Sequence, residues 1–301
     1  MIHGIINVYK EKGFTSHDVV AKLRGIVGQK KIGHTGTLDP DATGVLPVCL
    51  GKATKLCDLL TDKDKTYEAV MLLGKTTDTQ DITGEILEER STESLTEEKV
   101  REEIESFIGD YDQIPPMYSA LKVNGKKLYE LAREGKVVER KARPVKILDI
   151  RIIEMDLPRV RMEVSCSKGT YIRTLCHDIG EKLGCGGCME SLIRTRVSAF
   201  QIKDAKTLAE IETLKQEGML EKILVPIDEM FPSYPKITVK DDWKAFAKNG
   251  NPLELKMLKE ADGQNEENQV RLYDEAGKFI AIYQWKEKEK KYHIVKMFFN
   301  E

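Results

Sequence analysis

The chain has 301 residues, of which 48 are lysine or arginine and 50 are aspartate or glutamate, so its net charge at pH 7 is −2. This length suits one domain of ordinary size and a small second domain, and no apolar run approaches the roughly 18 residues of a membrane span. Because the first residues also lack a secretion-signal pattern, we expect a cytoplasmic protein whose six cysteines are reduced.

Helix and strand patterns alternate irregularly along the first two thirds of the chain. Residues 15–28 predict a helix with Thr15 or Ser16 as its N-cap and Gly28 past its end. Strand patterns occupy residues 67–74 and 160–175, and helix patterns that end at glycines occupy 95–109 and 170–184. Regular crossover helices do not separate the strands. The sequence therefore predicts an α+β fold with a mixed, largely antiparallel sheet flanked by helices.

Residues 113–146 form a basic stretch with two prolines, an Asn-Gly pair at 124–125, and Tyr118 and Tyr129 among its lysines. Nine lysines and arginines stand there against three acidic residues, whereas residues 78–112 carry three against thirteen. Residues 1–55 are also basic, with eight against four. Such segregation favours a polyanion bound on one face, although solvated helices also produce it. The stretch is a candidate lid or clamp.

The pattern of predicted elements changes near Pro226. Residues 226–235 are typical of a linker, and a helix pattern follows at 241–250. Strand patterns at 270–285 and 292–299 include a hairpin-like turn at 275–277. We therefore expect a first domain at 1–230 and a small β-rich domain at 235–301.

Four glycines and two prolines make residues 31–55, KIGHTGTLDPDATGVLPVCLGKATK, a tight loop segment that a ligand can approach closely. It is not a phosphate-binding loop, because Ala53 follows Lys52 where a serine or threonine would hold magnesium. Asp39 and Asp41 lie too close in sequence to flank a bond as paired carboxylates do in glycosidases. One carboxylate must act alone or with partners from elsewhere.

A zinc site is the alternative function for Cys185 and Cys188, which form a CxxC motif near Cys176 and His177. A structural zinc ion needs four ligands, and no second CxxC or histidine pair follows. We expect no metal, and we expect these cysteines to be small buried residues of a helix turn.

The segment 33–55, GHTGTLDPDATGVLPVCLGKATK, resembles the signature of TruB-type pseudouridine synthases. Five further segments match that family in the expected order, namely 65–69, 77–84, 115–135, 166–184 and 192–200. The resemblance implies isomerisation of the uridine at position 55, in the TΨC loop of tRNA, without a cofactor or metal. This reaction breaks an N-glycosidic bond and rejoins the uracil to the same ribose through carbon, so nothing is added or lost.

The resemblance also implies a set of catalytic residues. Asp39 matches the nucleophilic aspartate, and an aspartate with a pKa of about 3.9 is ionised at neutral pH. The residues alone do not decide whether Asp39 attacks the sugar, adds to the ring or promotes loss of a ribose proton. Arg173 matches the cation that keeps this carboxylate charged. Tyr67 matches the tyrosine that stacks on the target base, and Tyr171 and Leu192 match positions in the pocket.

Further matches concern RNA binding. His34 matches the residue that fills the space left by the flipped uridine, and Asp81 matches an acidic position near the bound loop. Lys55 is a candidate phosphate contact. Residues 113–146 resemble the family's RNA-clamping insertion, and residues 235–301 resemble a PUA domain that contacts the acceptor end.

Two alternatives remain at this stage. A non-catalytic tRNA-binding or tRNA-folding protein would use the same basic surfaces, but it would not need the carboxylate of Asp39. A dyskerin-like synthase would depend on a guide RNA and partner proteins. The insertion at 113–146 favours a stand-alone enzyme, so we expect a monomer that binds the TΨC stem-loop of tRNA without an obligate protein partner.

Overall fold

The structure is a computed structural model that describes residues 1–123, 125–259 and 269–299, so Asn124 of the expected Asn-Gly turn lies outside the described residues. A large sheet contains β1 (Gly4–Lys10), β2 (Ile32–His34), β3 (Thr43–Leu50), β4 (Lys65–Leu73), β7 (Gly109–Gln113), β10 (Arg143–Asp156), β11 (Arg159–Cys166), β12 (Gly187–Val197), β13 (Phe200–Gln201) and β14 (Leu224–Val225). Two hairpins consist of β5 (Lys75–Thr77) with β6 (Ile86–Glu89), and β8 (Lys122–Val123) with β9 (Lys126–Lys127). A second sheet contains β15 (Lys236–Thr238), β16 (Gln269–Tyr273), β17 (Phe279–Lys286) and β18 (Lys291–Met297).

The helices lie around these sheets. The α-helices are α1 (Ser16–Val27), α2 (Cys57–Thr61), α3 (Glu97–Glu105), α4 (Leu128–Arg133), α5 (Ile172–Leu183), α6 (Leu208–Gln216) and α7 (Asp241–Lys248). Short 3-10 helices are η1 (Gly51–Leu56), η2 (Ile202–Asp204), η3 (Leu220–Ile223), η4 (Ile227–Met230) and η5 (Leu255–Met257). Among the described residues, no helix is long and apolar enough to cross a membrane. All six cysteines are free thiols.

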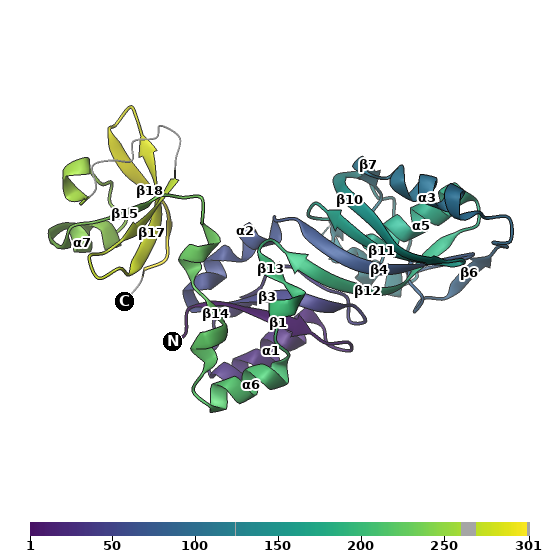
Figure 1. The fold of residues 1–301 in the computed structure, drawn as a ribbon, viewed down its shortest axis with the longest axis horizontal. Helices are drawn as coiled ribbons and strands as arrows, with labels where there is room; N and C mark the ends of the chain where they lie inside the picture. Colours follow the sequence, from purple (N-terminus) through teal and green to yellow (C-terminus); the bar gives the residue numbers. More distant parts are fainter. Residues whose placement is uncertain (124, 260–268, 300–301) are drawn as a thin grey trace.

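The large sheet has the order β14-β1-β3-β12-β4-β11-β10-β7, with β2 added to β3 and β13 added to β12 (Figure 1). Neighbouring strands along this order run antiparallel except β3 and β12, which are parallel and share only the pairs Ile193↔Thr43 and Arg194↔Gly44. The prediction of an α+β fold with a largely antiparallel sheet is confirmed. The short parallel contact divides the sheet into two halves.

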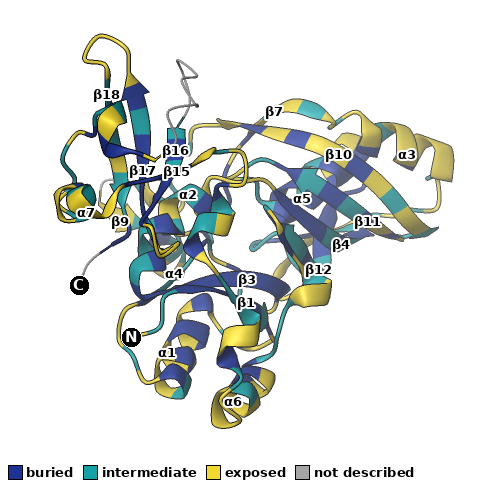
Figure 2. Ribbon diagram, turned by 60° about the vertical axis from the view of Figure 1, so that its left-hand side comes forward, coloured by how far each residue is buried: buried dark blue, intermediate teal, exposed yellow. Residues whose placement is uncertain are grey.

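The first half is covered by α1 and α6, which lie together against β1 and β3 (Figure 1). The predicted helix at 15–28 is present, because Thr15 and Asp18 form a capping box and Gly28 ends the helix in the left-handed conformation. Its buried residues Val19 and Leu23 face the strands, while its outer residues are exposed (Figure 2). This half of the fold follows directly from an amphipathic helix pattern.

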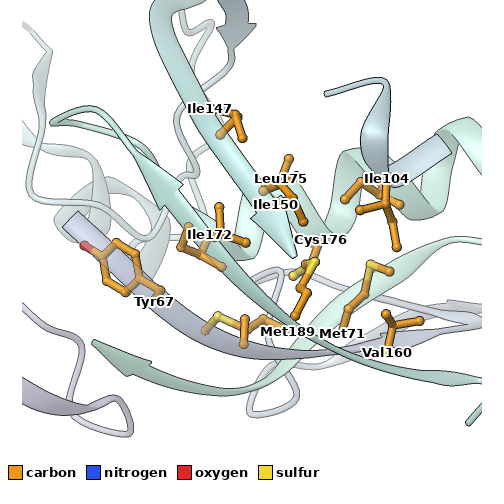
Figure 3. Packing of buried hydrophobic residues seen from close by; sticks show 14 of the residues in the cluster. Tyr67, Met71, Ile104, Ile147, Ile150, Val160, Ile172, Leu175, Cys176 and Met189 are labelled. Carbon is orange, nitrogen blue, oxygen red and sulfur yellow. The ribbon is translucent and has the colours of Figure 1, made fainter. Parts of the chain in front are cut away.

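The second half is covered by α5 and α3, whose apolar residues share a core with β4, β10 and β11 (Figure 3). Two predicted boundaries are wrong. The helix expected at 95–109 ends at Glu105, because Gly109 begins β7 and adopts a φ of +116° there. The strand expected at 160–175 ends at Cys166, and the chain turns before α5 begins at Ile172.

Most of the basic stretch lies between two paired strands of the large sheet. The chain leaves β7 at Gln113 and returns in β10 at Arg143, and these two residues are paired partners. Between them lie the β8–β9 hairpin and α4, which form a small core of their own around Met117, Leu128 and Leu131. The two ends of this segment are therefore held side by side by the sheet, while its core is separate from the core of the sheet.

The second sheet packs through its own apolar cluster around Tyr283 and Trp285, with α7 against it. Its predicted helix and strands are present, and the turn at 275–277 is closed by the Gly277 N–H, which donates to the Asp274 carbonyl at 2.9 Å. Ile282 and Phe298 also join a core with the first half of the large sheet. The two sheets are therefore connected by apolar contact as well as by the chain.

The CxxC residues are buried, as expected, but the expectation that they lie in a helix turn is wrong. Gly184 ends α5, Cys185 follows it, and Cys188 already belongs to β12. A Cβ at Gly180 would lie 2.2 Å from the Gly187 nitrogen, so the glycines permit α5 and β12 to touch. Among the described residues, no group of three or more potential ligands suits a metal ion.

Candidate functional site

The loop between β2 and β3 presents Asp39 at the junction of the two half-sheets. Its apolar residues Leu38 and Ala42 are buried in the core, whereas the Asp39 side chain is 46% exposed. The Leu38 N–H donates to the Ser16 hydroxyl at 2.9 Å, and the Ala42 N–H donates to the Asp39 carbonyl at 3.1 Å. The backbone is fixed while the carboxylate remains accessible, which is the arrangement that a reactive group requires.

Arg173 lies in the first turn of α5 and forms an ion pair with Asp39. Its Nη2 atom is 3.5 Å from Asp39 Oδ2, and its Nη1 atom is 3.6 Å from Asp81 Oδ2. Nη2 also donates to the Tyr118 carbonyl at 2.5 Å. The Arg173 side chain is only 7% exposed, so water screens its charge weakly. Thus one guanidinium group contacts two carboxylates and the insertion.

Asp81 is held in the turn between β5 and β6. Its Oδ1 atom accepts from the Thr83 N–H at 3.0 Å and from the hydroxyls of Thr79 at 2.9 Å and Thr83 at 2.5 Å. The turn uses one carboxylate oxygen and leaves Oδ2 for Arg173. The structure therefore brings Asp81 to Asp39 indirectly, through a shared arginine.

Tyr67 lies on β4, in the core that also contains Leu38, and it marks one end of that cluster in Figure 3. Burial raises the pKa of its hydroxyl, and the Arg194 guanidinium opposes that rise. Leu192 packs against the same cluster from β12. The apolar side of the site is therefore built by two adjacent strands and the Asp39 loop.

Tyr171 is the N-cap residue of α5, and its ring centroid lies 6.0 Å from the Arg173 guanidinium carbon. The side-chain amide of Gln113 accepts from the Tyr171 N–H at 2.8 Å and donates to its carbonyl at 3.0 Å. Gln113 is the residue at which the insertion begins. The start of α5 and the base of the insertion are thus fixed to each other.

His34 ends β2, and its ring meets the His17 ring edge-on at 5.3 Å. Burial, then the nearby His17, lowers the pKa of His34, so the ring is neutral near pH 7. Lys55 is placed differently, since its Nζ atom donates to the Met297 carbonyl of β18 at 2.7 Å. Lys55 therefore contacts the second sheet.

Two buried cations near the loop were not identified from the sequence. Lys10 has no exposed surface, and its Nζ atom donates to the carbonyls of Phe14 at 2.6 Å and Pro40 at 3.0 Å. Burial lowers the pKa of Lys10 to about 8, while the carboxylates of Asp39 and Asp41 oppose that change. Arg194 is 1% exposed and belongs to the matched segment 192–200. Lysines and arginines on strands are usually expected at the surface, so nothing in the sequence pattern marked them.

Comparisons with known proteins identify the family of this chain. The model of the TruB family pseudouridylate synthase (N terminal domain) matches residues 24–172, and that of the tRNA pseudouridylate synthase B C-terminal domain matches residues 173–232. The tRNA pseudouridine synthase B of Lachnoclostridium phytofermentans is 57% identical to this chain over 99% of the chain and 100% of the relative. The tRNA pseudouridine synthase B of Clostridium perfringens is 44% identical over 100% of both chains.

Solved structures show the same fold. A Cbf5-Nop10-Gar1 complex contains a chain with a TM-score of 0.72 and 29% identity, covering 99% of this chain and 85% of that one. An H/ACA RNP bound to a substrate RNA containing 2′-deoxyuridine contains a chain with a TM-score of 0.72 and 27% identity, covering 99% and 86%. The two family models include the segments that carry Asp39, Tyr67 and Arg173. The chain belongs to the TruB family of pseudouridylate synthases.

Proposed function

We propose that this chain is a tRNA pseudouridine synthase that isomerises uridine 55 in the TΨC loop of tRNA. The observation that carries the proposal is the accessible Asp39 carboxylate, 3.5 Å from the buried guanidinium of Arg173. A surface that only binds RNA gains nothing from an exposed carboxylate, because a carboxylate repels the phosphates of the RNA. The isomerisation does need one.

Asp39 acts in this proposal on the ribose or the uracil of the bound uridine. The N-glycosidic bond breaks, the uracil turns, and its C5 atom bonds to the same ribose carbon. The product gains a proton at N1 and loses one from C5, so the reaction requires no added group. Arg173 orients the Asp39 carboxylate through their ion pair, and the ring of Tyr67 stacks on the target base. Tyr171 and Leu192 line the uridine pocket in this proposal, next to Arg173 and to the core of Tyr67 respectively.

The uridine must leave the folded loop before Asp39 reaches it, at a cost of a few kcal/mol. We assign His34 to the vacated space, since its half-buried ring ends β2 just before the loop that carries Asp39. The insertion at 113–146 serves as the clamp, and its exposed cations are Lys122, Lys126, Arg133, Lys136, Lys141, Arg143 and Lys146. Asp81 supports the clamp side of the site through Arg173.

The second sheet, within residues 235–301, acts in this proposal as a PUA-like domain that contacts the acceptor end of the tRNA. Lys55 remains a candidate phosphate contact because it lies near two other lysines. Burial lowers the pKa of Lys55, and the positive charges of Lys31 and Lys296 lower it further. A cation beside other cations gains from an anion more than an isolated one does. The part of this domain at 260–268 and 300–301 lies outside the described residues.

We further propose that the enzyme acts alone, as a cytoplasmic monomer. The solved structures with a TM-score of 0.72 belong to multi-component assemblies, but their identity to this chain is 27–29%. The relative at 57% identity is named tRNA pseudouridine synthase B. The inserted clamp also gives this chain its own means of holding RNA, which a guide would otherwise provide.

The test uses the purified chain without any other protein or RNA. An unmodified tRNA transcript is incubated with the chain, and pseudouridine is mapped along the transcript. We expect one site, at position 55, and no product from a transcript with cytidine there. Product at another position would refute the assignment of uridine 55. If the purified chain forms pseudouridine only after another RNA or protein is added, the stand-alone assignment is refuted. Light scattering on the same sample measures the oligomeric state.

A further inference from the structure

Arg194 occupies the point where the two half-sheets meet. It pairs with Tyr67 of β4 on one side and with Gly44 of β3 on the other. A Cβ at Gly44 would lie 2.3 Å from the Arg194 carbonyl oxygen, so β3 and β12 approach more closely than side chains allow. Paired residues on adjacent strands place their side chains on the same face. Arg194 therefore lies beside Tyr67, beneath the loop that presents Asp39.

The guanidinium of Arg194 holds that loop through main-chain oxygens. Its Nε atom donates to the Val45 carbonyl at 2.7 Å, and Nη1 donates to the Thr37 carbonyl at 3.4 Å. Thr37 is two residues before Asp39, and Val45 lies in the strand that follows the loop. A Cβ at Gly36 would lie 3.8 Å from Nη1, so the loop rests on the guanidinium. Both ends of the Asp39 loop are thus attached to one side chain.

The charge of Arg194 is not explained by stability. The residue is 1% exposed, its Nη2 atom has no hydrogen-bond partner, and no ion pair of the described residues includes it. A buried charge without a carboxylate partner costs more free energy than an apolar side chain of the same volume. Burial lowers the pKa of Arg194, and the titratable group that opposes this change is Tyr67.

Resting on the proposed function, we propose that Arg194 is a positioning residue for pseudouridine formation, which fixes the Asp39 loop and directs its charge at the Tyr67 hydroxyl. A cation beside a phenol favours release of the phenolic proton. Tyr67 is then better suited to move a proton while it stacks on the base. The positive charge, and not only the hydrogen bonds to carbonyls, is required for this role.

The same strand offers a matched control in Arg196. A β-bulge between the two arginines changes the register, so Arg194 pairs with Tyr67 whereas Arg196 pairs with Thr66. Arg196 therefore lies on the opposite face of the sheet, where its Nε atom donates to the Thr66 hydroxyl at 3.0 Å. Two arginines of one strand, two positions apart, differ in whether they face the site.

The experiment compares Arg194→Lys, which keeps the charge, with Arg194→Gln, which keeps donors without charge. The single-turnover rate with excess enzyme and the Kd for tRNA are measured for each variant, with thermal unfolding as the check on folding. We expect the rate of the Gln variant to fall roughly 100-fold or more below that of the unchanged chain. The Lys variant should be at least about tenfold faster than the Gln variant, and the Kd of both should change by less than about threefold. Arg196→Gln should stay within about threefold of the unchanged chain in rate.

Equal rates for the Gln and Lys variants, or a Gln variant as active as the unchanged chain, would overturn the inference. A parallel loss of tRNA affinity would also overturn it, because it would mark a general structural role. If Arg194→Gln does not fold, Arg194→Lys must still lose rate at unchanged Kd. An inactive unchanged chain would instead refute the proposed function, so the two failures are distinguishable.

Discussion

Arg173 and Asp39 form an ion pair across the candidate site in which the two partners differ in exposure. The guanidinium is 7% exposed and the carboxylate 46%, with 3.5 Å between Nη2 and Oδ2. The cation is therefore fixed by the protein, whereas the carboxylate is free to face a substrate. A surface ion pair would show exposure on both sides and would contribute about 0–1 kcal/mol. This asymmetry is the basis of the first two predictions.

Asp39→Asn should abolish pseudouridine formation, because the amide cannot supply the negative charge that the reaction uses. We expect a loss of at least about 1000-fold in the single-turnover rate, with the Kd for tRNA changed by less than about threefold. Asp41→Asn is the matched control, since its carboxylate is exposed and lies 3.7 Å from Lys12 Nζ. Appreciable product from Asp39→Asn would disprove the assignment of Asp39.

Arg173→Lys should lower the single-turnover rate by about 100-fold or more, because an ammonium group cannot contact both carboxylates and the Tyr118 carbonyl in one planar arrangement. The exposed pair of Arg151 with Glu163, at 3.1 Å, provides the control variant Arg151→Lys. That variant should retain its rate within about twofold. A fully active Arg173→Lys would show that charge alone suffices.

Tyr118→Phe tests the attachment of the insertion. The Tyr118 hydroxyl donates to Asp78 Oδ2 at 3.0 Å, which connects the insertion to the turn that carries Asp81. One hydrogen bond of about 0.5–1.5 kcal/mol corresponds to about 2- to 12-fold in affinity, so tRNA should bind more weakly by that factor. The rate at saturating enzyme should not change.

The control for this prediction is Tyr129→Phe, whose hydroxyl accepts from Lys127 Nζ at 3.2 Å within the insertion. That bond does not reach the rest of the protein, so its loss should leave Kd within about twofold. The prediction fails if Tyr118→Phe lowers the saturated rate while Kd stays the same, since the insertion would then act on the chemistry.

His34 should make folding stability depend on pH. Burial and His17 lower its pKa in the folded protein below the ordinary value of 6.5. As the pH falls through 6.5 the unfolded chain binds a proton that the folded chain does not, so stability decreases until the pH reaches the folded-state pKa. The unfolding temperature should therefore fall more between about pH 7.5 and pH 5 for the unchanged chain than for His34→Gln. Equal falls would contradict a depressed pKa.

Local patterns in the sequence were enough to predict the α+β class, the capped helix from Ser16 and the strands of the second sheet. Periodicity, caps and turns act within a few residues, so they are readable without knowing the fold. The helix expected to end at Gly109 shows the limit of this reasoning. A glycine there also suits the entry to a strand, and only pairing with β10 decides which structure forms.

The resemblance named Asp39, Tyr67 and Arg173 as candidate catalytic residues, and their arrangement in space follows from the folded chain. Asp39 and Arg173 are 134 positions apart, and their ion pair depends on α5 packing beside the parallel contact of β3 and β12. Arg194 illustrates the same point more strongly. Simple alternation would place Arg194 and Arg196 on one face, yet the bulge at Thr195 separates them. A bulge arises from cross-strand pairing and not from local pattern, which is why the buried arginine beneath the Asp39 loop was recognisable only in the folded chain.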